Sequence, residues 1–260
     1  MCCGIKENKN MKNMNIRLLL LPLMAIALQA CKTENAVKNS ENYVERNINV
    51  NDFTDISIEG SNNVYFIQGN KTSVKVSGNE EDIKRMKIYS KDNTLHIKEE
   101  SKSISLMSLL RNPRKDVNVY VTSPNIRGVS VLGSGNFSAK EGIDTDRLKL
   151  KITGSGDISI NSIICNESSI GVVGSGSIEI NSLTTAQSDM GIPGSGSISI
   201  SNATIKNVTG SITGSGSIEL NNANIGYAKS KITGSGSIDI QGKVDKHDES
   251  VTGSGSVNVR

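Results

Sequence analysis

The sequence has no basic excess on its main part. Of 29 basic and 26 acidic residues, four basic residues and one acidic residue lie within the first 31 positions, which leaves 25 of each sign from Lys32 onward. Domains that bind nucleic acid normally carry a basic excess, so the balance argues against nucleic acid as a partner. The length of 260 residues allows one large domain or two small ones with a buried core.

Aromatic residues and long apolar runs are also scarce. The chain has no tryptophan and only five tyrosines and three phenylalanines. Its first apolar stretch, from Ile16 to Ala30, is too short for a comfortable membrane span. A basic head with Lys12 and Arg17, an apolar centre and small residues before Cys31 indicate a secretory signal instead.

The segment Leu28-Gln29-Ala30-Cys31 resembles the bacterial lipobox. The resemblance implies that residues 1–31 end in a lipidated cysteine, Cys31, and that a lipid anchor makes the membrane a partner. Cys165 then has no disulfide partner in the mature chain, and its apolar neighbours favour a small buried side chain. We expect residues 32–46 to form a flexible tether, and we expect no cofactor and no metal site.

What the sequence does contain is a repeat. Gly-Ser-Gly occurs every 19 to 21 residues, at positions 133–135, 154–156, 174–176, 194–196, 214–216, 234–236 and 253–255. A fixed period of this length indicates a stack of similar structural units.

Alternating residues follow most copies of Gly-Ser-Gly. Ile158 and Ile160 flank Ser159, and the next four copies continue in the same way. A period of two predicts a strand with one solvated face. The solvated positions form a series that we name the polar column: Ser159, Glu179, Ser199, Glu219 and Asp239.

Repeats of 20 residues with stacked β-branched side chains and glycine corners predict a right-handed, single-stranded parallel β-helix. Each repeat forms one coil, and coils stack about 4.8 Å apart. Glycine supplies positive φ at the corners, and parallel crossovers are right-handed. Further apolar columns predict about three short strands in each coil. Amide side chains beside the polar column predict a ladder along the stack: Asn161, Asn181, Asn221 and Gln241.

The predicted β-helix domain, residues 47–260, has two parts. Residues 123–260 hold the regular repeats, and residues 47–122 form a less regular entry or capping part. Alternation predicts strands around the five segments 56–58, 64–67, 74–76, 95–97 and 117–121. We also expect one helical turn within 79–85 and a protruding loop at 101–115.

Several of these segments resemble one bacterial family. They include the octapeptide Phe53-Thr54-Asp55-Ile56-Ser57-Ile58-Glu59-Gly60 and the run from Val129 to Gly135. From about Asn47 to the C-terminus, the order of segments resembles the head GIN domain family of auto-transporter adhesins, found on Bacteroidetes-type lipoproteins. The resemblance implies a β-helix on an envelope protein and an adhesin-like role. It supplies no catalytic residues.

An enzyme is the first alternative to a binding role. Glu219 and Asp239 occupy the same position in successive coils, about 5 Å apart at the backbone, which resembles the carboxylate pair of a retaining glycosidase. Their neighbours in the column predict no cleft, and aromatic residues for sugar stacking are scarce. Calcium coils need an aspartate after each glycine corner, and among the uninterrupted repeats only Asp157 meets this need. Both patterns favour a solvated sheet face without catalytic activity.

The binding hypothesis rests on the polar columns, which predict a hydrogen-bonding surface suited to a glycan or to another surface protein. The alternative is a structural envelope or stalk component without a specific ligand. In both cases we expect an outer-membrane, lipid-anchored protein, and display on the cell surface remains open. The last strand, Ser256 to Val259, has no coil after it, which predicts weak end-to-end association of two copies.

Overall fold

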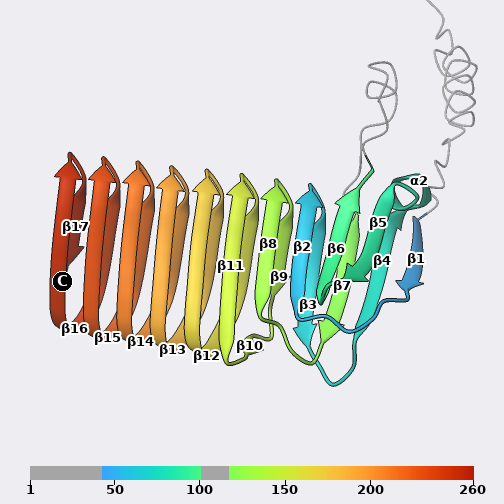
Figure 1. Cartoon of the computed structure of the whole chain (residues 1–260), viewed down its shortest axis with the longest axis horizontal. Coiled ribbons are helices and arrows are strands. Elements are labelled where there is room, and N and C mark those ends of the chain that lie inside the picture. Colours follow the sequence, from blue (N-terminus) through green and yellow to red (C-terminus); the bar gives the residue numbers. More distant parts are fainter. Residues whose placement is uncertain (1–42, 101–116) are drawn as a thin grey trace, which may run out of the picture. The chain divides into compact units, whose positions relative to one another are not determined.

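The computed structural model describes residues 43–100 and 117–260. These residues form a stack of coils (Figure 1), which confirms the predicted parallel β-helix. The predicted signal peptide with Cys31, the tether up to residue 42 and nearly all of the predicted loop at 101–115 lie outside the described residues. Within the described ranges, no helix is long and apolar enough to cross a membrane.

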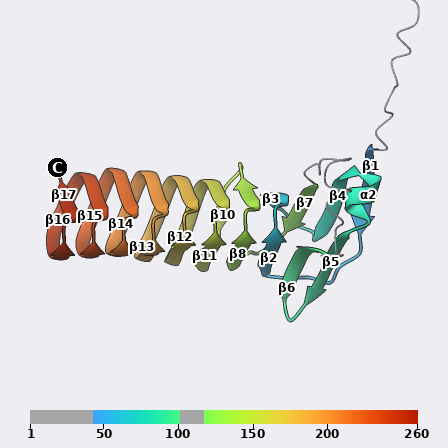
Figure 2. The ribbon, with the colours of Figure 1, turned by 90° about the horizontal axis from the view of Figure 1, so that it is seen from above.

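Five consecutive coils make up the regular part of the stack: β12 (Asp157–Gly174), β13 (Ser177–Gly194), β14 (Ser197–Gly214), β15 (Ser217–Gly234) and β16 (Ser237–Gly253). Neighbouring coils pair in parallel with matching residues side by side, so Ile178 pairs with Ile198 and Ile198 with Ile218. Seen from above, the coils follow one another as turns of a solenoid (Figure 2).

Each coil is a single bent strand of 17 or 18 residues. This differs from the three short strands that we expected in each coil. The reason is that pairing with neighbouring coils continues around the bends. In β13 and β14, for example, matched pairs extend from Ser177 with Ser197 to Gly194 with Gly214. From β12 to β16, one strand ends and the next begins at a Gly-Ser-Gly corner.

At each corner the backbones of two coils lie in direct contact. Gly174 has a φ of +120°, a conformation that side-chain-bearing residues rarely adopt. A Cβ atom placed on it would lie 2.4 Å from the carbonyl oxygen of Gly154. The same carbonyl accepts a hydrogen bond of 2.9 Å from the Ser175 N–H. Glycine is therefore required by both the backbone angle and the neighbouring coil.

The core is a continuous column of aliphatic side chains inside the coils. Ile198 has an exposed fraction of 0%, and its matched residues Ile178 and Ile218 are also buried. Burial alternates along each strand, with the apolar residues inside and the polar column outside. Cys165 is buried as expected, with Sγ 3.5 Å from the Thr185 hydroxyl.

The stack of coils also contains strands from far earlier in the chain. β2 (Asp55–Gly60) pairs with β8 (Gly128–Gly133), and β3 (Asn63–Gln68) pairs with β9 (Asn136–Ala139). β10 (Ile143–Asp144) and β11 (Arg147–Gly154) then lead into β12. Gly60 lies beside Gly133 and so extends the column of corner glycines by one coil.

The entry part closes the stack with antiparallel strands. Its elements are β1 (Tyr43–Ile48), β4 (Ser73–Asn79), α2 (Glu80–Ile83), β5 (Met86–Lys91), β6 (Thr94–Glu99) and β7 (Asn118–Ser123). β6 and β7 add in parallel to β2 and β3. β5 then pairs antiparallel with β6, β4 with β7, and β1 with β4. This antiparallel layer forms the cap that we expected from the irregular sequence.

Two local predictions in the cap have different outcomes. The expected helical turn is present as α2, and the Asn79 side chain caps it by accepting a 3.0 Å hydrogen bond from the Glu81 N–H. The boundary at residue 47 needs correction, because β1 already begins at Tyr43. Val44 and Ile48 pack against the core, which gives this short segment apolar contacts that its polar sequence does not suggest.

The last coil differs from the coils before it. At positions that point inward elsewhere, β16 carries His247 beside Ala228 and Glu249 beside Ser230. Val251 lies beside the fully buried Ile232, yet its exposed fraction is 40%. β17 (Ser256–Val259) pairs with the first residues of β16. Charged inward positions disfavour pairing with another strand, so they oppose the expected end-to-end association, which remains a prediction.

Candidate functional site

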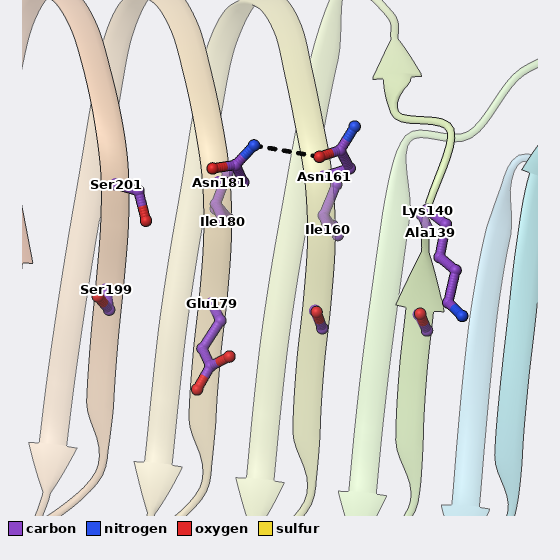
Figure 3. A pocket seen from close by; sticks show the side chains of 11 residues that line it. Ala139, Lys140, Ile160, Asn161, Glu179, Ile180, Asn181, Ser199 and Ser201 are labelled. Atoms are coloured by element: carbon purple, nitrogen blue, oxygen red, sulfur yellow. Dashed lines mark hydrogen bonds between the residues drawn. The ribbon is translucent and has the colours of Figure 1, made fainter.

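The polar column borders the largest groove of the described residues. The groove has a volume of about 510 Å³. It crosses four consecutive coils, from the end of β9 to β14, and it is lined by Ser138, Ala139, Lys140, Ser159, Ile160, Asn161, Glu179, Ile180, Asn181, Ser199 and Ser201. Figure 3 shows these side chains as they come from neighbouring coils.

The sheet register brings three residues of the polar column together in this groove. Ser159 pairs with Glu179, and Glu179 pairs with Ser199. Because alternate strand residues point to opposite faces, these side chains point outward, while the adjacent Ile160 and Ile180 are buried. Glu179 is exposed and supplies the carboxylate of the groove lining.

Glu219 and Asp239 continue the same column beyond the groove. They pair with each other in successive coils. The Asp239 carboxylate accepts a 2.7 Å hydrogen bond from the Asn258 side chain, and the Arg260 guanidinium lies 4.0 Å away. Neither carboxylate lines the groove, so the structure separates this pair from the concave part of the face.

The amide side chains beside the groove form contacts in two lines. The Asn181 side chain donates a 3.1 Å hydrogen bond to Asn161 Oδ1, as Figure 3 shows. In the next coils the contacts move by one residue. Asn202 donates to the Asn181 carbonyl at 2.8 Å, and Asn222 donates to Asn202 Oδ1 at 3.2 Å. Ser201 has no amide and interrupts the first line.

The expected ladder therefore needs adjustment in its second half. Of its four members, Asn161 and Asn181 contact each other through their side chains. Asn221 and Gln241 occupy the expected places after the later Ile strands, but the amide contacts pass through Asn202 and Asn222 instead. Asn222 has a φ of +42°, so the backbone itself is adjusted at this bend.

Sequence reasoning missed the groove residues of the first coil. Ser138 pairs with Ser159, so it belongs to the polar column, and Lys140 lies close by as the cation of the groove. Both come from the coil that is 21 residues long. A count in steps of 20 therefore misses them, although aligning the Gly-Ser-Gly corners would have found Ser138.

The structure offers little to a catalytic hypothesis. Within the described ranges, no group of three or more His, Cys, Asp or Glu side chains could hold a metal ion. His247 Nε2 does lie 3.1 Å from the Ser230 hydroxyl, a contact that the sequence did not suggest, but Ser230 has an exposed fraction of 3%. Burial raises the pKa of the Cys165 thiol, which keeps it protonated and unreactive at neutral pH.

A second, smaller groove of about 220 Å³ lies on another face of the stack. Its lining mixes charges of both signs, and Arg147 forms a 3.2 Å ion pair with Glu167 across it. Below it, Ser168 donates a 2.8 Å hydrogen bond to the buried Ser188 hydroxyl. The internal pairing leaves this groove with less free hydrogen-bonding capacity than the first.

Solved structures from gut bacteria have the same fold. An adhesin structure from Bacteroides fragilis aligns with 25% identity and a TM-score of 0.75, covering 85% of this chain and 98% of that chain. An adhesin structure from Parabacteroides merdae aligns with 20% identity, a TM-score of 0.75 and coverage of 85% and 97%. The structure of a protein described as lipid binding, from Parabacteroides distasonis, aligns with 21% identity, a TM-score of 0.73 and coverage of 85% and 98%.

No curated protein matches the chain. A family model does match it, over residues 52–242, and its description is "Putative auto-transporter adhesin, head GIN domain". The match spans most of the regular coils together with the capping part, which is the region where the sequence first suggested this resemblance. The chain belongs to the head GIN domain family.

Proposed function

We propose that this protein is a lipid-anchored component of the outer membrane that binds a glycan or a surface protein through the groove along its polar column. The observation that carries the proposal is the 510 Å³ concavity lined by hydroxyl, amide and carboxylate side chains. Binding sites are typically concave and hold a few convergent polar groups. The family description as an adhesin supports a binding role at the cell envelope.

A lipid tail is a less suitable ligand for this groove. One structural neighbour, from Parabacteroides distasonis, is described as a lipid binding protein. Here, however, the groove lining consists largely of serine, asparagine, glutamate and lysine, and its isoleucines are buried. A hydrocarbon chain needs an apolar surface, because it cannot satisfy the hydrogen bonds of the polar groups that it covers.

The binding role can be tested on the purified full chain in detergent with an oligosaccharide array. We expect Glu179→Gln to lower binding about tenfold, because a charge-assisted hydrogen bond is worth about 1.5 kcal/mol. Glu219→Gln is the matched control, since Glu219 lies in the same column but outside the groove. Equal losses in the two variants would contradict a site in the groove. Absence of any bound glycan or envelope protein would favour the structural alternative.

Anchoring can be tested independently of the ligand. Replacement Cys31→Ser should give an unlipidated precursor that is lost from the outer-membrane fraction. Mass spectrometry of the mature wild type should find a lipid on the Cys31 sulfur, and a free thiol there would contradict the anchor. Protease treatment of intact cells then distinguishes display at the surface from a periplasmic orientation.

A further inference from the structure

We infer that the groove continues into an aromatic platform, formed by Tyr65 and Tyr120, and that the ligand is a neutral polysaccharide chain lying along the β-helix axis. This inference rests on the proposed function and specifies its ligand. Sequence spacing gave no sign of such a platform, because Tyr65 precedes the first Gly-Ser-Gly by 68 residues. The pairing of the entry strands reveals it.

The two tyrosines stand in the polar column. Tyr120 of β7 pairs with Tyr65 of β3, and Tyr65 pairs with Ser138 of β9. Ser138 in turn pairs with Ser159, the next residue of the column. One line of outward positions thus runs from the capping part through the groove, in the order Tyr120, Tyr65, Ser138, Ser159, Glu179, Ser199, Glu219 and Asp239.

The rings are stacked along this line. Their centroids are 5.3 Å apart and their planes differ by 21°. On its other side, Tyr120 faces the Lys75 ammonium, which lies 5.2 Å from the ring centroid. Beyond Tyr65 stands Ser138, whose side chain is too short to cover a phenol ring. The face of Tyr65 that is turned toward the groove is therefore available to a ligand.

This arrangement matches the two surfaces of a sugar. The negative face of an aromatic ring attracts positively polarised groups, such as the C–H bonds on the apolar face of a pyranose. Hydroxyl groups of the following sugar units then meet Ser138, Ser159 and Glu179, which are hydrogen-bonding groups at steps of about 4.8 Å. From Tyr65 to Glu179 the line covers three coil steps, or about 14 Å, which favours a chain over a single sugar.

The charges along the line specify the class of polysaccharide. Three of its residues are carboxylates, Glu179, Glu219 and Asp239, while the cation in the groove is Lys140. Acidic sugars placed along this line would face charges of their own sign, which is unfavourable. Neutral sugars instead can donate hydroxyl hydrogen bonds to the carboxylates. The line therefore favours a neutral chain over one that contains uronic acids.

Titration of the full chain with neutral and with uronate-containing oligosaccharides tests the inference. The chain has no tryptophan, so its intrinsic fluorescence reports on tyrosine. We expect neutral oligosaccharides to bind and to change the tyrosine emission. Tyr65→Leu, which keeps an apolar side chain but removes the ring, should weaken binding about tenfold. Tyr65→Phe keeps the ring and should retain the affinity of the wild type within about twofold.

The matched control is Tyr89→Leu. Tyr89 is also exposed and stacked, but on His96 of another strand pair, with centroids 5.1 Å apart. Unchanged binding in Tyr65→Leu, together with a loss in Glu179→Gln, would overturn the platform and leave the groove in place. Preferred binding of uronate oligosaccharides would overturn the charge argument. If Tyr65→Leu fails to fold, an unchanged wild-type tyrosine emission at saturating neutral oligosaccharide still refutes the inference.

Discussion

Replacing Gly174 with alanine should destabilise the β-helix by about 3 kcal/mol. At a φ of +120°, a residue with a Cβ atom costs about 1–3 kcal/mol. The new Cβ would also lie 2.4 Å from the Gly154 carbonyl oxygen, so the two coils must move apart. That movement weakens the 2.9 Å hydrogen bond from Ser175 N–H to the same oxygen, at a cost of about 1 kcal/mol.

Gly171→Ala provides a control within the same strand. Gly171 lies three residues before Gly174 in β12, and the nearest atom to an added Cβ is the Gly191 carbonyl oxygen at 3.8 Å. Alanine fits this space without strain. We expect a stabilisation of about 0.5 kcal/mol, because alanine has less conformational freedom than glycine in the unfolded chain.

Urea unfolding followed by circular dichroism compares the two variants. With a slope of about 3 kcal/mol per molar urea, the loss in Gly174→Ala lowers the midpoint by about 1 M. The midpoint of Gly171→Ala should stay near that of the wild type or rise slightly. Equal shifts in the two variants would refute the argument, because they would show that the contact at the corner does not determine the need for glycine.

Three further predictions concern the core, the buried thiol and the last coil. Ile198→Asp places an unpaired charge in the core and should cost several kcal/mol, whereas Glu219→Ala should stay within about 0.5 kcal/mol; similar melting temperatures would contradict the inward and outward assignments. Because burial raises the pKa of the Cys165 thiol, little thiolate forms at pH 8, and iodoacetamide should label Cys165 only after unfolding; fast labelling of the folded chain would be inconsistent with this. Sedimentation should detect weak end-to-end association at high concentration, strengthened by Glu249→Gln because the charge opposes pairing; strictly monomeric behaviour of both chains would exclude it.

The regular coils could be predicted from the sequence because their period is constant. Matching Ile178 with Ile198 requires a step of 20 residues, and the structure uses that step without a shift between β13 and β14. The alternation of Ile and polar residues also predicts which side chains are buried. Glu179 was therefore placed on the outer face, and the structure adds the groove around it.

The entry part could not be predicted in the same way, because its partners lie far away in the sequence. Gly60 continues the column of corner glycines beside Gly133, but Asn62 stands where later corners have a second glycine. Tyr65 joins the polar column only because β3 pairs with β9 after an insertion of about sixty residues. Periodicity contains no information about such an insertion, so the aromatic platform becomes visible only in the structure.

The constant register of the coils has a consequence for how this family can vary. Each coil from β13 to β15 pairs with its neighbours through the same set of positions, so the duplication of 20 residues within this region creates two interfaces of the kind already present. Repeat stability is approximately a sum of such neighbouring terms. Evolution can therefore change the length of the stack in steps of about 4.8 Å while the antiparallel cap and the tyrosine pair remain unaltered. Relatives of different length would then present the same first sugar contact with a longer or shorter polar track behind it.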